Sequence, residues 1–238
     1  MDLGRVEITW LGHATFRFVA ADGTVVYVDP WLRDNPACPA TEREPPRVDA
    51  VFVTHGHFDH LGDTEALGRR LQPQVYCVYE MFLWLTRRGV PHVNGLTHGG
   101  TVEGPGGVRG TLVQAVHSGG IQLDDDRVVY GGEPGGWVLQ FPEGPTVYHA
   151  GDTMVFGDMQ LIGELWRPDI ALLPIGGFYV MDPRQAAVAA RLLGAPTVIP
   201  MHYGHFPMFT GTPQQLRDEA TDLDVEIVEL QPGRPLGP

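Results

Sequence analysis

The chain has 238 residues, of which 43% are hydrophobic and 19% charged, so it can bury a large core and is neither disordered nor fibrous. Its 31 glycines and 21 prolines are spread along the sequence without a repeat, which excludes a helical bundle. With 29 acidic and 16 basic residues the formal net charge is −13, which opposes binding to nucleic acid or to anionic lipid headgroups.

No linker or change of composition divides the sequence, so we expect a single domain over residues 1–238. No segment approaches the roughly 18 consecutive apolar residues of a membrane helix, and we expect a soluble, cytoplasmic protein without a membrane partner. The two cysteines, Cys38 and Cys77, are isolated and predict neither a disulfide nor a redox role.

The first part of the chain begins with strands and then alternates strands with helices. Alternation of apolar and polar residues predicts a β-meander at 6–10, 15–19 and 24–28. An irregular surface loop is expected at 33–47, followed by a buried strand at 48–54. Helical spacing then covers 61–71 and 80–89, with a strand at 75–78 between them.

The second part of the chain repeats this order. Further strands are expected at 108–116, 137–141, 146–148, 170–173, 197–200 and 225–230. Helices are expected at 156–166, 183–193 and 213–223. Two β-rich stretches, each followed by alternating strands and helices, predict an α/β fold in which two mixed β-sheets pack face to face with helices outside.

Four predicted strands lead directly to a residue that can bind a metal ion. These residues are His55, His117, Asp152 and His202. If the strands lie side by side, their carboxyl ends meet at one rim, where loops on a rigid sheet build functional sites. We therefore expect these four side chains to come together.

The densest group of such residues is the segment from His55 to His60, which holds three histidines and one aspartate. Histidine nitrogen and carboxylate oxygen suit borderline cations such as zinc. Four ligands this close on one turn cannot all reach a single tetrahedral centre without strain. The segment therefore implies two metal ions.

This HxHxDH pattern after a strand resembles the signature of the metallo-β-lactamase superfamily, whose fold is an αββα sandwich. The later candidate ligands follow in the family's order, so the resemblance covers nearly the whole chain. It implies a first metal ion on His55, His57 and His117. It implies a second ion on Asp59, His60 and His202, with Asp152 bridging both.

Shorter segments resemble one branch of this superfamily, the bacterial and archaeal metal-dependent hydrolases related to ascorbate-6-phosphate lactonases. They include WLGHA at 10–14, DPW at 29–31, GGEP at 131–134 and PIGG at 174–177. The opening LGH is also similar to that of N-acylphosphatidylethanolamine phospholipases D. The chain departs from the family pattern at Phe58 and Asp182, where glycine is commoner, and both larger side chains would narrow the cleft.

Four other residues are candidates for roles beside the metal ligands. His13 ends the first strand, and we expect it to act on substrate as an acid or base, the alternative being packing in a turn. Glu133 either supports a ligand histidine or is exposed to solvent. His149 either supports a ligand histidine or packs in the core. Tyr203 either donates to an oxyanion or packs. Three histidines have no comparable placement: His92, His98 and His205.

The sequence therefore predicts a metal-dependent hydrolase in which two metal ions activate a hydroxide, with Asp59 orienting this nucleophile and passing a proton to the leaving group. The expected substrate is a small anionic or carbonyl-containing molecule, with carboxylic esters or lactones and phosphodiesters ranked equally, and no nucleic acid. Zinc is the first choice of metal, and manganese, iron or nickel are alternatives. The other hypothesis is a metal-binding protein of the same fold without turnover.

Overall fold

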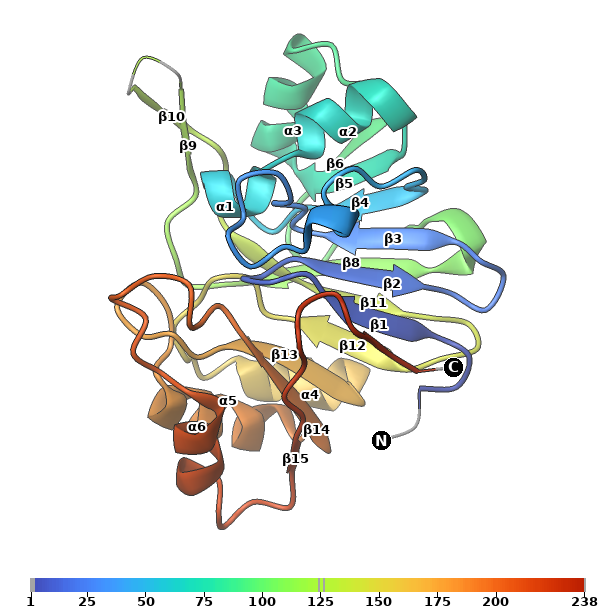
Figure 1. The fold of residues 1–238 in the computed structure, drawn as a ribbon. Helices are drawn as coiled ribbons and strands as arrows, with labels where there is room; N and C mark the ends of the chain where they lie inside the picture. The colour runs from blue at the N-terminus through green and yellow to red at the C-terminus, as the bar shows by residue number, and fades with distance from the viewer. Residues whose placement is uncertain (1–2, 124, 126, 238) are drawn as a thin grey trace.

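The computed structural model describes residues 3–123, 125 and 127–237. Its first sheet has the order β16-β1-β2-β3-β4-β5-β6 (Figure 1). The strands are β1 (Glu7–Trp10), β2 (Phe16–Val19), β3 (Val25–Val28), β4 (Ala50–Phe52), β5 (Gln74–Val78), β6 (Val93–Leu96) and β16 (Pro235–Leu236). Strands β1 to β3 form the predicted antiparallel meander, and β3 to β6 run parallel, so the sheet is mixed.

The second sheet has the order β15-β14-β13-β12-β11-β8-β7. The strands are β7 (Thr101–Glu103), β8 (Arg109–Gln114), β11 (Gly135–Gln140), β12 (Thr146–His149), β13 (Ile170–Pro174), β14 (Thr197–Met201) and β15 (Glu226–Ile227). It is also mixed, with parallel pairing from β12 to β15 and antiparallel pairing from β7 to β12. A hairpin of β9 (Gly120–Gln122) and β10 (Val128–Tyr130) projects from the body of the molecule (Figure 1).

The helices flank the two sheets. They are α1 (Phe58–Leu61), α2 (Thr64–Leu71), α3 (Tyr79–Arg87), α4 (Met159–Trp166), α5 (Pro183–Leu193) and α6 (Pro213–Glu219), with 3-10 turns at Ala40–Glu42 and Pro105–Gly107. Helices α2 and α3 lie at one end of the molecule and α4 to α6 at the other, with the strands between them (Figure 1). The structure confirms two mixed sheets with helices outside. None of the helices in the described ranges is long and apolar enough to span a bilayer.

Two helices show local features that the sequence did not predict. The helix expected at 61–71 is split into α1 and α2, because Gly62 adopts a φ of 39° and ends α1 within the histidine-rich segment. Asp182, which the sequence predicts to narrow the cleft, does not line the cavity at the metal-ligand candidates and instead caps α5: its carboxylate accepts a hydrogen bond from the backbone N–H of Gln185 at 2.8 Å.

Aromatic side chains fill the space between the sheets. The ring of Phe52 in β4 lies 4.9 Å from that of Trp137 in β11, edge to face. The indole N–H of Trp137 donates to the carbonyl of Val53 at 3.0 Å. A Cβ at Gly110 in β8 would lie 2.3 Å from the Phe52 ring, so only glycine permits this approach. The end of β4 is therefore held against the second sheet, and the HxHxDH segment that follows it is fixed at this edge.

Candidate metal centre

The residues at the four strand ends meet at one edge of the sandwich, although they come from both sheets. Strand β4 of the first sheet leads to His55, whereas β8, β12 and β14 of the second sheet lead to the other three. The four strands therefore do not all lie side by side, which is the arrangement considered from the sequence. Their ends meet because the two sheets are packed face to face.

The site consists of two groups of four side chains, and within each group the potential ligand atoms lie within 4.8 Å of one another. The first ligand group contains His55, His57, His117 and Asp152. The second ligand group contains His13, Asp59, His60 and His202. The structure thus brings together all seven predicted ligands and adds His13 to the second group.

The Asp152 carboxylate lies between the two groups. Its Oδ1 is 3.1 Å from Nε2 of His60, and its Oδ2 is 3.1 Å from Nε2 of His202 and 3.6 Å from Nε2 of His117. Gly151 makes this placement possible, because it turns the chain at the end of β12 with a φ of 60°, and a Cβ there would lie 2.8 Å from the carbonyl oxygen of Gly135.

The donor set fits two divalent cations. Three buried atoms, Nε2 of His60, Nε2 of His202 and Oδ1 of Asp152, contact one another within this centre but make no hydrogen bond of good geometry among the described residues. Nε2 of His55 and Nδ1 of His57 also face each other at 2.9 Å. Imidazole nitrogens and carboxylate oxygens directed at a common point are the ligands that zinc and similar cations bind.

A layer of buried hydrogen bonds holds the histidines in place, and sequence reasoning missed it. Oδ2 of Asp29 accepts a hydrogen bond from Nδ1 of His60 at 2.7 Å, and both side chains are fully buried. The hydroxyl of Thr54 donates to Oδ2 of Asp29 at 2.7 Å and lies 3.0 Å from Nδ1 of His55. These contacts leave Nε2 of both histidines facing the centre. Asp29 directly follows β3, so the rule of residues at strand ends also applies to it.

Burial keeps most of the site histidines neutral and ready to bind a cation. Desolvation lowers the pKa of His55 well below its usual value, and it also lowers the pKa of His57 and of His117. Desolvation, aided by the neighbouring His202, lowers the pKa of His13 to about 3. Metal binding at these residues would therefore displace few protons at neutral pH.

His60 and the carboxylates behave differently. Burial opposes a charge on His60, but Asp152, Asp29 and Asp59 outweigh it and raise the pKa of His60 well above its usual value. Burial likewise opposes ionisation of Asp59, but His60 and His13 outweigh it and lower the pKa of Asp59 to about 2. Without a cation, a protonated His60 supplies the positive charge that these carboxylates require.

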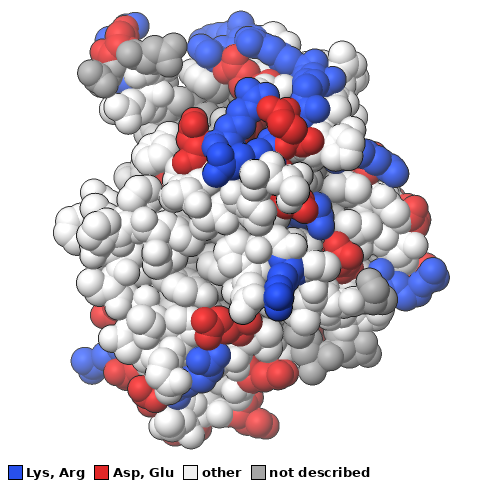
Figure 2. All heavy atoms as spheres, in the orientation of Figure 1, with Lys and Arg blue, Asp and Glu red and all other residues white. Residues whose placement is uncertain are grey.

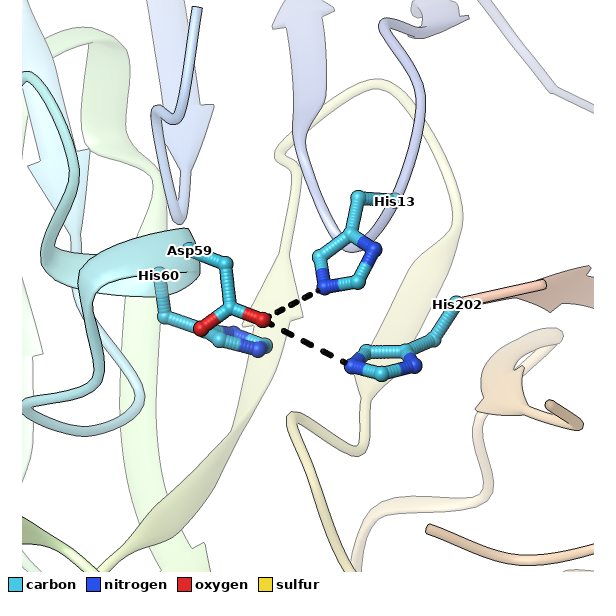
Figure 3. A group of neighbouring side chains, drawn as sticks. All are labelled: His13, Asp59, His60 and His202. Atoms are coloured by element: carbon cyan, nitrogen blue, oxygen red, sulfur yellow. Dashed lines mark hydrogen bonds and ion pairs between the residues drawn. The ribbon is translucent and has the colours of Figure 1, made fainter. Parts of the chain in front are cut away.

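His13 is fully buried in the turn between β1 and β2 and points at Asp59. Its Nε2 lies 2.7 Å from Oδ2 of Asp59, which also lies 3.9 Å from Nε2 of His202 (Figure 3). The backbone N–H of His13 donates to Nε2 of His205 at 2.7 Å, a contact that the sequence did not indicate. His13 does not line the cavity above the site, whereas its partner Asp59 does, and a role of His13 as an acid or base on substrate stays a prediction.

The other three candidates lie around the site rather than in it. Glu133 is exposed, accepts a hydrogen bond from the hydroxyl of Tyr130 at 2.8 Å and belongs to neither ligand group. His149 is buried, donates to the carbonyl of Ala14 at 2.8 Å and accepts from the N–H of Gly151 at 3.1 Å, so it braces two loops of the site. Tyr203 stacks on Trp10 with ring centroids 5.4 Å apart.

Three site residues adopt a left-handed backbone conformation that is unusual for residues other than glycine. The φ angles are 56° at His13, 47° at Asp29 and 56° at His202. Each such residue costs on the order of 1–3 kcal/mol and persists only where the surrounding structure enforces it. The strain coincides with the strand ends that direct these side chains into the site.

A cavity of about 460 Å³ opens onto both ligand groups. The metal-ligand candidates that line it are His57, Asp59, His117, Asp152 and His202. A small substrate in this cavity would therefore contact the metal centre directly.

Comparison with known proteins agrees with this geometry. Residues 24–203 match the family described as the beta-lactamase superfamily domain. The chain is 52% identical over 233 residues to a UPF0173 metal-dependent hydrolase of Koribacter versatilis, covering 98% of each chain. It is 46% identical over 237 residues to the corresponding protein of Rubrobacter xylanophilus, covering 99% of this chain and 98% of that one.

The fold is also similar to a solved structure. Igni18, described as a novel metallo hydrolase from the hyperthermophilic archaeon Ignicoccus hospitalis, superposes with a TM-score of 0.83 and 34% sequence identity over 97% of each chain. On these matches, the chain belongs to the UPF0173 family of metal-dependent hydrolases within the β-lactamase superfamily.

Proposed function

We propose that the protein hydrolyses a small carboxylic ester, lactone or phosphodiester at a centre of two divalent cations. The observation that supports this most strongly is the position of Asp152, whose two oxygens approach histidines of both ligand groups on the floor of a cavity. His55, His57 and His117 would hold one ion, and Asp59, His60 and His202 the other, with zinc as the first choice. When bound, such ions supply Lewis acidity and a water whose pKa falls to about 7.

The chain's own residues provide the remaining functions. Asp59 lines the cavity and is ionised at neutral pH because its pKa is about 2. Its carboxylate can therefore accept a hydrogen bond from the attacking nucleophile and orient it. His13 lies behind Asp59 at 2.7 Å and holds the carboxylate in this position. The buried Asp29 and Thr54 fix the rings of His60 and His55 in the same way.

Metal content and turnover together test this proposal. Protein purified in the presence of zinc or manganese should hold close to two equivalents, one for each ligand group. It should hydrolyse members of a panel of lactones, p-nitrophenyl esters and bis(p-nitrophenyl) phosphate, and a chelator should abolish this activity. Two bound ions without turnover would instead support a metal-binding protein, and no bound metal would contradict both functions.

A further inference from the structure

The cavity above the metal centre has two chemically different sides. The metal-ligand candidates form one part of its lining, and apolar side chains form most of the rest, with the uncharged polar residues Ser118 and Gln122 beside them. Phe58 comes from α1, Tyr179 from the segment after β13, and Phe206, Met208 and Phe209 from the segment after β14. We call these five residues the apolar wall.

The apolar wall is held together by contacts between its rings. Phe206 and Phe209 meet edge to face with centroids 5.5 Å apart, and Tyr179 lies 6.3 Å from Phe209. The buried Trp31 lies 5.7 Å from Phe58 and 6.4 Å from Phe206, and so connects the two sides of the wall. These contacts give a preformed surface, as expected for a site that binds apolar groups.

Much of this apolar surface remains in contact with solvent. Phe58 is 60% exposed, Tyr179 58% and Met208 40%. Phe178 and Met154 in neighbouring segments are also exposed. Figure 2 shows charged side chains at the two ends and along the right-hand side of this face, whereas the left of its middle is largely uncharged. A contiguous exposed apolar surface marks a binding site more often than isolated apolar residues do.

The cavity offers no counter-ion for an anionic group remote from the metal centre. Its only charged lining residues in the described part of the chain are Asp59 and Asp152, together with the histidines. No arginine within the described ranges lines it, and the sequence contains no lysine. A substrate could place one anionic or carbonyl group on the metal ions, but a second negative charge at the apolar wall would lose its hydration without a positively charged partner.

We propose that the apolar wall selects carboxylic esters or lactones whose acyl or aryl group is apolar, and that it disfavours doubly anionic substrates such as sugar phosphates. This inference rests on the proposed hydrolytic function of the site. The scissile carbonyl would lie over the two ligand groups, with its apolar substituent against Phe58, Tyr179, Phe206 and Met208. Phe58, which lines the cavity, would contribute to this selection.

A series of p-nitrophenyl esters tests the selection on metal-loaded protein. From acetate through butyrate to hexanoate, kcat/KM should rise about two- to fourfold per methylene, since a fully buried methylene contributes roughly 0.8 kcal/mol. The half ester of adipate has the chain length of hexanoate but ends in a carboxylate, and its kcat/KM should fall well below that of hexanoate. Equal values across the series, or a preference for the adipate ester, would overturn the inference.

Binding of the free acids gives a readout that does not depend on turnover. In calorimetric titrations of metal-loaded protein, hexanoate should bind at least tenfold more tightly than acetate, and adipate more weakly than hexanoate. If no ester or phosphodiester is hydrolysed but hexanoate still binds preferentially, the proposed function fails and the inference about the wall stands. If esters are hydrolysed but the acids bind equally, the wall inference alone is wrong.

Substitutions in the wall identify the residues responsible. Replacing Phe206 and Met208 together by serine should lower the ratio of hexanoate to acetate kcat/KM toward one, with metal content measured in parallel. Leu165→Ser is the matched control, because Leu165 is an exposed apolar residue on α4 outside the cavity lining. A ratio that stays at the wild-type value in the double variant would overturn the assignment of the wall.

Discussion

Asp152 is the side chain that the two ligand groups share, so its loss should affect both cations. Asp152→Ala removes the carboxylate that approaches His60, His202 and His117. The two bound cations would then lack the negative charge that they share. We expect bound metal to fall from about two equivalents to one or none and hydrolysis to be lost. Elemental analysis measures this, with the exposed Asp158→Ala as control. Retention of both ions by Asp152→Ala would contradict the bridging role.

Asp29 acts on the site through His60 rather than by direct contact with a cation. Asp29→Asn weakens the acceptor that holds Nδ1 of His60 at 2.7 Å and disturbs the Thr54 hydroxyl that lies beside His55. Loss of such a partner typically lowers metal affinity about 10- to 100-fold. Competition with a chromophoric chelator measures the affinity, and Asp34→Asn, in an exposed position, is the control. Wild-type affinity in Asp29→Asn would show that this hydrogen bond is dispensable.

At the scale of elements, the turn between β1 and β2 connects the first sheet to the metal centre. The carbonyl of His13 accepts a hydrogen bond from the N–H of His202 at 3.0 Å, and the carbonyl of Ala14 accepts from His149. Gly12 adopts a φ of 94° beside Ala37, where a Cβ would lie 2.5 Å from the Ala37 Cβ. The turn is therefore tightly packed, and it brings the His13 ring to Asp59.

This placement leads to a prediction for His13→Ala. Because His13 lies in the second ligand group and holds the Asp59 carboxylate that would bind the second ion, we expect bound metal to fall toward one equivalent and kcat to fall with it. His205→Ala, which removes a neighbouring histidine outside both groups, should keep two equivalents. Metal content and the melting temperature of the metal-free protein distinguish the roles. A lower melting temperature with two ions and a normal kcat would make His13 a purely structural residue.

The sequence predicts the elements that carry ligands better than the contacts between them. Apolar runs that lead directly into histidine or aspartate are recognisable in the sequence, and the positions of His55, His117, Asp152 and His202 follow from this pattern. The contact of β4 with the second sheet cannot be recognised in the sequence, because it depends on Phe52 packing against Trp137 far along the chain.

Short elements and buried partners were missed for related reasons. Strands β9 and β10 have three residues each, and α1 has four, so no periodicity can develop in them. The hydrogen bond from His60 to Asp29 joins residues 31 positions apart, and the left-handed φ of both His13 and Asp29 is imposed by tertiary packing. These features appear only when the whole chain is folded.

At the scale of the whole molecule, histidines with a lowered pKa outnumber the one whose pKa is raised. Burial lowers the pKa of His13, His55, His57, His117, His149 and His205, reaching about 3 at His13 and about 4 at His205. His60 alone among the histidines with a resolved shift has a raised pKa. In the unfolded chain all of them titrate near their usual value of about 6.5.

The metal-free protein should therefore lose stability as the pH falls from about 6.5 to about 4. In this window the unfolded chain takes up protons that the folded histidines with lowered pKa do not, so the free energy of unfolding decreases. His60 has the opposite sign, because its contribution is complete below about 6.5 and is lost only as the pH rises through its raised pKa, but it is one residue against six. Asp59, with a pKa of about 2, lowers the free energy of unfolding further only below about pH 3.8.

Urea unfolding of chelator-treated protein at about pH 7 and about pH 5 should show a lower midpoint at the acidic pH. An equal or higher midpoint there would mean that the buried histidines are protonated in the folded protein, and the site could not then be held ready for cations by neutral imidazoles.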